Sequence, residues 1–204
     1  SEIKWVFLDM GSTLVDESDV YESRCNYVIS AKGLEHDEFI EKVHHAAKVS
    51  PTPIKQAAQA YGVALPEWNS SLEKLYLETE DVLKALSGKY KLGIIANQLA
   101  GTQKRLHNWG VLQYFDVVAA SAEAGYEKPD LRIFKLALEQ AGCNPQNAIM
   151  VGDRLENDIA PARQLGMKTI WVRQGFAKYQ SVEKECEKPD YIIENIGEIV
   201  KVLI

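Results

Sequence analysis

The chain has 204 residues, of which 46% are hydrophobic and 25% charged, and its formal net charge at pH 7 is −6. This length suffices for one large domain or for a core domain with a smaller insertion, and the composition is ordinary for a globular protein. The acidic balance argues against nucleic acid or an anionic membrane as a partner, because lysines and arginines are scattered along the chain and form no basic patch.

The first predicted element is the apolar run Trp5–Leu8, which ends in Asp9 and breaks at once into small residues. Such a run predicts a buried strand that delivers a carboxylate to an exposed turn, where the carboxylate can act as a nucleophile. Two positions later the chain has Gly11, so no second carboxylate follows Asp9 at that spacing.

The next interval, from Asp16 to about Thr79, contains helical patterns and no plausible strand. Its apolar residues recur at helical spacing in three stripes, which are Val20, Tyr21, Cys25, Val28 and Ile29, then Phe39, Ile40, Val43, Ala46 and Ala47, then Ile54, Ala57, Ala58 and Tyr61. An insertion of this size is too large for a strand-to-helix loop. Residues 16–79 are therefore expected to form a helical cap over the strand ends.

Five further apolar runs follow, at residues 92–96, 117–120, 148–151, 169–172 and 191–193. Each is continuous rather than alternating, which is typical of strands buried on both faces in a parallel sheet. Segments between them have helical spacing, as in Pro129–Ala141 with Gly142 as a stop. The sequence thus predicts an α/β core, a Rossmann-like parallel sheet flanked by helices, formed by residues 1–15 and 80–204.

Charged residues follow three of the predicted strands. Asp9 follows the first strand, Lys128 the third and Asp153 the fourth, with Asp158 five residues further on. Open α/β sheets place their sites at such strand ends, so three carboxylates are expected to share one crevice. Their mutual repulsion would raise a pKa unless cations compensate, and Lys128 and Mg²⁺ are the natural candidates.

Three motifs connect these residues to a known family. They are Asp-x-x-x-Thr-Leu at 9–14, Lys-Pro-Asp at 128–130 and Gly-Asp-x-x-x-x-Asp at 152–158. With the helical insertion after the first strand, the chain resembles the haloacid dehalogenase-like (HAD) hydrolase superfamily, in the subgroup with a helical cap at that position. The resemblance covers essentially the whole chain.

The resemblance implies a Mg²⁺-dependent phosphatase for a small phosphorylated metabolite. Asp9 would attack phosphorus to form an aspartyl-phosphate, which water later hydrolyses. Mg²⁺ would be held by the Asp9 carboxylate, the backbone carbonyl of Gly11 and Asp153. Lys128 would neutralise the nucleophile and bind the phosphoryl oxygens, and Asp158 would orient Lys128 or a metal-bound water.

One departure from the family lies at Gly11, where its phosphatases usually carry a second Asp that acts as general acid and then as general base. Such catalysis typically contributes 10²–10⁴-fold, so hydrolysis of alkyl phosphates is expected to be slow. If the missing proton transfer limits the rate, Gly11→Asp should accelerate it by roughly tenfold or more.

A second departure concerns contacts to phosphate. The family's phosphate-binding Ser or Thr aligns with Ala96, and the amide of neighbouring Asn97 is expected to substitute in part. Thr13 is expected to support the site. Ser12 stands where Gly is usual, and either a hydroxyl contact or a turn would explain it.

Other interpretations stay open. Dehalogenases and phosphonatases of this superfamily also lack the second Asp, but the former work without metal and the latter need a cap lysine, for which Lys32, Lys42 and Lys48 are candidates. A non-catalytic module that binds a phosphorylated ligand or a protein is the third possibility.

Within the cap, Tyr21, Arg24 and Lys48 are candidates for substrate contact, whereas His44 and His45 are expected at the surface. Glu156 is expected on a solvated face of the core, and Trp68 in packing.

The cysteines and the hydropathy profile predict a cytoplasmic protein. Cys25, Cys143 and Cys186 are far apart and lack metal-ligand spacing, so reduced thiols are expected. No stretch approaches the roughly 20 apolar residues of a membrane span, and no signal peptide is recognisable.

Overall fold

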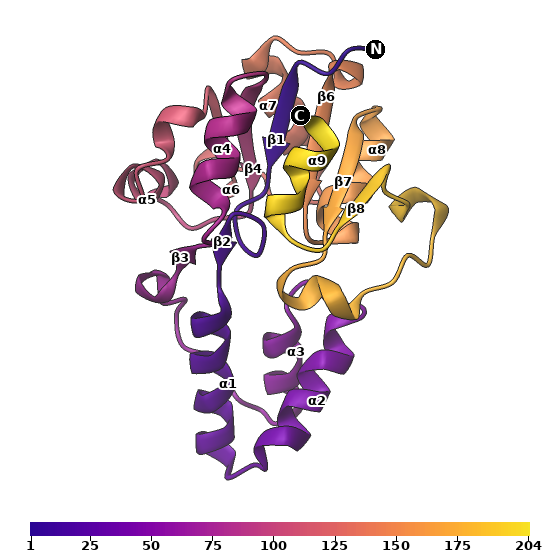
Figure 1. Ribbon diagram of the computed structural model, residues 1–204. Coiled ribbons are helices and arrows are strands. Elements are labelled where there is room, and N and C mark those ends of the chain that lie inside the picture. The colour runs from indigo at the N-terminus through magenta and orange to yellow at the C-terminus, as the bar shows by residue number, and fades with distance from the viewer.

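The apolar runs form the strands of one parallel sheet in the computed structural model, which describes residues 1–204 (Figure 1). In spatial order the strands are β5 (Val117–Ala120), β4 (Lys91–Ala96), β1 (Trp5–Leu8), β6 (Ala148–Gly152), β7 (Lys168–Val172) and β8 (Tyr191–Ile193). Every neighbouring pair is parallel. The predicted α/β fold class is confirmed.

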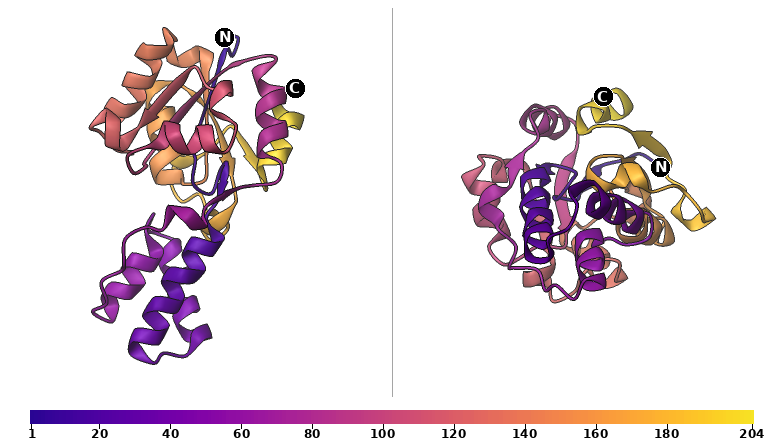
Figure 2. Two further views of the ribbon diagram at one scale, coloured as in Figure 1. Left: turned by 90° about the vertical axis from the view of Figure 1, so that its left-hand side faces the viewer. Right: turned by 90° about the horizontal axis from the view of Figure 1, so that it is seen from below.

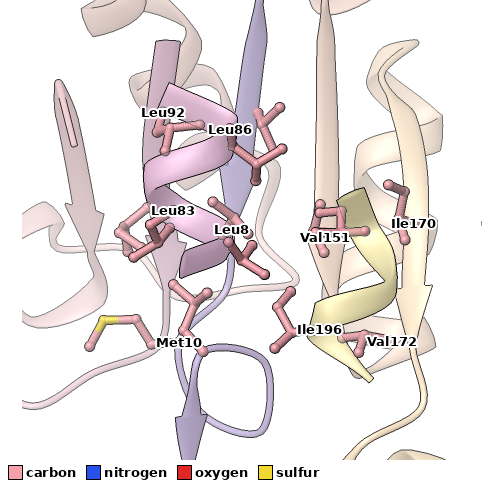
Figure 3. Close-up of a cluster of buried hydrophobic side chains, with 14 of the residues drawn as sticks. Leu8, Met10, Leu83, Leu86, Leu92, Val151, Ile170, Val172 and Ile196 are labelled. Atoms are coloured by element: carbon pink, nitrogen blue, oxygen red, sulfur yellow. The ribbon is translucent and has the colours of Figure 1, made fainter. Parts of the chain in front are cut away.

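Helices cover both faces of this sheet. They are α4 (Thr79–Ser87), α5 (Thr102–Asn108), α6 (Ser121–Ala124), α7 (Leu131–Ala141), α8 (Ala160–Leu165) and α9 (Ile199–Leu203). Side chains of β1 alternate between the faces, so Leu8 packs with α4 and α9, whereas Phe7 packs with α7 and α8. Figure 3 shows the first of these clusters, in which Leu83 and Leu86 of α4 lie against the sheet.

Helix α7 begins two residues later than the sequence predicts. Asp130 is its N-cap, since the Asp130 carboxylate accepts a hydrogen bond from the N–H of Arg132 at 2.9 Å. The predicted stop is confirmed at Gly142, which adopts φ 58°, a left-handed conformation that favours glycine.

A helical lobe lies beyond the carboxyl ends of the strands (Figures 1 and 2). It contains α1 (Ser18–Lys32), α2 (His36–Ala47) and α3 (Pro53–Ala60). These helices bury a cluster of their own, in which Val28, Phe39 and Ala58 are fully enclosed. The three predicted stripes therefore form helices that pack mainly on one another.

The interval predicted to lack strands contains a short antiparallel ribbon. Strand β2 (Val15–Asp16) pairs with β3 (Lys74–Leu75) where the chain enters and leaves the lobe. The two chain segments that connect the lobe to the core run side by side, so their backbone N–H and C=O groups can hydrogen-bond to each other. A two-residue strand has no sequence periodicity, which is why the pattern did not reveal it.

Buried polar contacts join the lobe to the core. Arg154 is 6% exposed and pairs with Glu156 at 2.6 Å. It also donates to the carbonyls of Ala47, the last residue of α2, and of Ser50. The prediction of Glu156 on a solvated face was thus wrong, because this carboxylate also accepts from Gln180 at 2.6 Å.

His44 is likewise half-buried rather than free at the surface. Its ring stacks on Tyr179 with the ring centroids 4.1 Å apart, whereas neighbouring His45 is exposed.

None of the helices is long and apolar enough to cross a membrane.

Candidate active site

The acidic residues expected at the strand ends meet at the carboxyl edge of the sheet. Strands β4 and β5 lie on one side of β1, whereas β6, β7 and β8 lie on its other side. The strand order therefore reverses beside β1. The N–H of Asp9 donates to the carbonyl of Val151 at 2.9 Å, which holds Asp9 close to the end of β6. One carboxylate oxygen from each of Asp9, Asp153 and Asp158 lies within 4.8 Å of the others.

Lys128 is the cation of this cluster. Its ammonium lies 2.9 Å from Oδ1 of Asp9 and 2.6 Å from Oδ1 of Asp158, and the residue is 4% exposed. Burial by itself would lower the pKa of Lys128, but Asp158 and Asp9 outweigh it and raise that pKa above the usual range. Lys128 is therefore charged, and one ammonium faces three carboxylates.

Burial and the excess of negative charge raise the pKa values of Asp153 and Asp158. Burial raises the pKa of Asp153 well above its usual range, and the charges of Asp9 and Asp158 raise it further. Burial also raises the pKa of Asp158 to about 6, although the Lys128 ammonium acts in the opposite direction. The Asp153 carboxylate accepts a hydrogen bond from the hydroxyl of Thr13 at 3.5 Å. Hard oxygen donors with surplus negative charge suit a divalent cation such as Mg²⁺.

These shifts predict how stability depends on pH in the absence of metal. The pKa of Asp158 is about 6 in the folded protein and 3.8 for an ordinary aspartate. Between these two pH values the folded state therefore binds more protons than the unfolded state. Unfolding free energy should then fall as pH rises from about 4 to 6. Urea denaturation with EDTA should show lower stability at pH 7 than at pH 5, and Mg²⁺ should recover the loss at pH 7. Higher metal-free stability at pH 7 would contradict this account.

Gly152 lets the carboxylate of Asp158 reach the strand end. A Cβ atom on Gly152 would lie 2.2 Å from Cγ of Asp158, a distance that no side chain could tolerate. The N–H of Arg154 donates to Oδ2 of Asp158 at 2.9 Å, while Oδ1 contacts Lys128. With both oxygens engaged, Asp158 is placed to orient Lys128.

Asn97 also holds Lys128. Its Oδ1 accepts from the N–H of Lys128 at 2.7 Å, and its Nδ2 donates to the Lys128 carbonyl at 2.9 Å. Both polar atoms of the amide thus contact the Lys128 backbone. Asn97 therefore positions Lys128, and its expected contact with phosphate stays a prediction.

The carboxylate of Glu17, a residue that no sequence motif singles out, fills the space beside Gly11. A Cβ atom on Gly11 would lie 2.6 Å from Oε1 of Glu17, which is 9% exposed. Burial raises the pKa of Glu17 to about 7, and the charge of Asp9 adds to this although a hydrogen bond from Tyr21 opposes it. Because Gly11→Asp would have to displace Glu17, we do not expect that substitution by itself to accelerate hydrolysis. No sequence spacing reveals that the turn after Gly11 returns Glu17 to this place.

Cavities lie on both sides of Glu17. One of about 250 Å³ extends into the lobe and is lined by Arg24 and Trp68, whose guanidinium and ring are 5.3 Å apart. Another, of about 350 Å³, extends along the core and is lined by Asn97 and Arg105. Glu17 and Trp68 line both cavities.

The other proposed cap residues differ in position. Tyr21 lines the lobe cavity, and its hydroxyl donates to Glu17. Lys32, Lys42 and Lys48 are exposed and line neither cavity.

Comparisons with known proteins give a consistent result. Residues 6–172 match the family model described as haloacid dehalogenase-like hydrolase. The chain is 29% identical to a glyceraldehyde 3-phosphate phosphatase of Methanothermobacter thermautotrophicus, over 97% of this chain and 87% of that protein. It is 30% identical to the protein of the same name in Pyrococcus furiosus, over 98% and 93%.

Solved structures share the fold. A HAD phosphatase from Thermococcus onnurineus has a TM-score of 0.67 at 24% identity, over 98% of each chain. Magnesium-bound YfnB from Bacillus subtilis has a TM-score of 0.73 at 18% identity, over 100% of this chain and 99% of that one.

Proposed function

Since the chain belongs to the haloacid dehalogenase-like hydrolase family, we propose that it is a Mg²⁺-dependent phosphatase acting on a small phosphorylated metabolite through Asp9. The observation that carries the proposal is the cluster of Asp9, Asp153 and Asp158 around the ammonium of Lys128. The names of the relatives support phosphate-ester hydrolysis over the other reactions of the superfamily.

The residues of the cluster have different roles in the proposed reaction. The carboxylate of Asp9 attacks phosphorus, and the bond from phosphorus to the leaving oxygen breaks. Lys128, held by Asp158 and Asn97, neutralises charge on Asp9 and then on the phosphoryl oxygens. Mg²⁺ bound by Asp9, the Gly11 carbonyl and Asp153, with Thr13 in support, would offset the repulsion between carboxylate and phosphate dianion.

The lobe is assigned the role of a cap. In this division residues 1–15 and 80–204 are the catalytic core and residues 16–79 the cap, which excludes water and selects the substrate. The two cavities beside Glu17 support a small substrate, and Arg24 and Arg105 offer it positive charge. The exposed positions of Lys32, Lys42 and Lys48 argue against a Schiff base of the phosphonatase kind.

Release of orthophosphate tests the proposal. Triose and sugar phosphates, a nucleoside monophosphate, pyrophosphate and 4-nitrophenyl phosphate would be assayed with Mg²⁺ and with EDTA. We expect turnover of at least one ester that EDTA stops and Mg²⁺ restores. Phosphonoacetaldehyde and a 2-haloacid serve as matched alternatives, and turnover of either one alone would contradict the phosphatase assignment. Phosphate binding without turnover of any compound would favour a binding module instead.

A further inference from the structure

The carboxylate of Glu17 occupies the place of the side chain that position 11 lacks. A Cβ atom on Gly11 would meet Oε1 at 2.6 Å and both Cδ and Oε2 at 2.7 Å. The whole carboxylate therefore lies against this one backbone position, two residues after Asp9. A carboxyl group is present beside the nucleophile, but it comes from the start of α1 rather than from the turn itself.

Neighbouring residues hold Glu17 there. Tyr21 donates to Oε1 at 2.7 Å, and Ser12 donates to the same oxygen at 3.2 Å. Ser12 adopts φ 57°, a left-handed conformation rarely found for residues with a Cβ atom, and it is the one non-glycine residue here with positive φ. The unusual backbone aims its hydroxyl at Glu17. Oε2 has no protein donor, so it is available to another partner.

A structural role for Glu17 is not sufficient to explain this arrangement. Glu17 is the N-cap residue of α1, yet its side chain makes no capping hydrogen bond. It lies instead at the meeting point of the lobe and core cavities, where Trp68 is the other shared residue. Burial of a carboxyl group is unfavourable unless hydrogen bonds or charges compensate it, and in Glu17 only Oε1 receives hydrogen bonds. In contrast, Asp19 in the first turn of the same helix is exposed and pairs with Lys74.

We propose that Glu17 is the proton-transfer residue of this hydrolase, in place of the Asp that the family's phosphatases carry at the position of Gly11. The inference rests on the proposed phosphatase function. As Asp9 forms its bond to phosphorus, the ester P–O bond breaks and the carboxyl proton of Glu17 moves to the leaving oxygen, which departs as an alcohol. The Glu17 carboxylate then takes a proton from water as the water oxygen bonds to phosphorus and the bond from phosphorus to the Asp9 oxygen breaks. Orthophosphate leaves, Asp9 is regenerated as a carboxylate and Glu17 is protonated again.

The isosteric variant Glu17→Gln separates proton transfer from packing. First-turnover rates would be measured by rapid quench with an alkyl phosphate and with 4-nitrophenyl phosphate, whose leaving group needs no proton. We expect release of the alcohol to fall by about 100-fold or more and release of 4-nitrophenol by less than about tenfold. Subsequent turnover of the aryl ester should be slow, giving a burst of 4-nitrophenol, because water loses its base.

Matched variants complete the experiment. Asp19→Asn removes a carboxylate from the same helix turn and should change neither rate. In a Glu17→Ala background, which opens the space, Gly11→Asp should recover roughly tenfold or more of the alkyl rate. Equal losses for both esters in Glu17→Gln, or a folded double variant no faster than Glu17→Ala, would overturn the proposal. Failure of the phosphatase function itself would appear separately. Wild-type protein would then release no product, or the rate of product release would be the same in Asp9→Asn as in wild type.

Discussion

Asp9→Asn should abolish hydrolysis of every phosphate ester, lowering kcat by about 10⁴-fold or more. The amide oxygen is a poor nucleophile, and the substitution also removes the charge that pairs with Lys128 at 2.9 Å. The measurement is orthophosphate release under saturating substrate and Mg²⁺. A covalent phosphoryl group, trapped by acid quench from wild-type protein, should be missing from the variant.

The fold should survive this change. Asp9 is one of three crowded carboxylates, and its charge raises the pKa of Asp153. Removing that charge relieves repulsion, so the metal-free variant should unfold at a temperature no lower than wild type. Asp19→Asn, at an exposed position, is the control for loss of a carboxylate. A folded Asp9→Asn protein within tenfold of the wild-type rate would refute covalent catalysis by Asp9.

Lys128→Met should cost about 3–5 kcal/mol of unfolding free energy without metal at neutral pH. The substitution keeps the apolar stem but leaves Asp9, Asp153 and Asp158 buried with no cation among them. Lowering the pH should recover stability, because protonation removes the repulsion and the folded state takes up those protons. Urea denaturation at pH 5 and pH 8, with and without Mg²⁺, measures the effect.

A second lysine provides the comparison. Lys168 is an exposed residue that lies 3.5 Å from Asp190, and loss of such a surface pair should change stability by about 1 kcal/mol or less. Lys128→Met should also lose most of its hydrolytic activity even when Mg²⁺ restores the fold. The charge-cluster account fails if Lys128→Met and Lys168→Met lose similar stability, or if the loss is the same at pH 5 and pH 8.

The strands could be predicted because the information is local. Continuous apolar runs such as Ile149–Val151 are typical of a strand covered on both faces, and parallel strands send their carboxyl ends to one edge. Chemistry-bearing residues that follow such runs must therefore meet, as Asp9 and Asp153 do. Residues whose position depends on distant partners are harder to predict. The sequence favours a solvated face for Glu156 because nothing nearby in the chain shows that Arg154 is buried under the lobe.

By itself the sequence determined the fold class and the charged cluster, because hydrophobic patterning specifies the sheet and the motifs at strand ends specify Asp9, Lys128, Asp153 and Asp158. Only the tertiary structure decided what stands beside Gly11. The turn between β1 and α1 has no periodicity, and its course depends on the left-handed backbone of Ser12 and on packing of the lobe. Along this course the carboxylate of Glu17 comes to lie beside Gly11. The carboxyl group that the sequence lacks at position 11 is thus supplied by a residue six positions further along the chain.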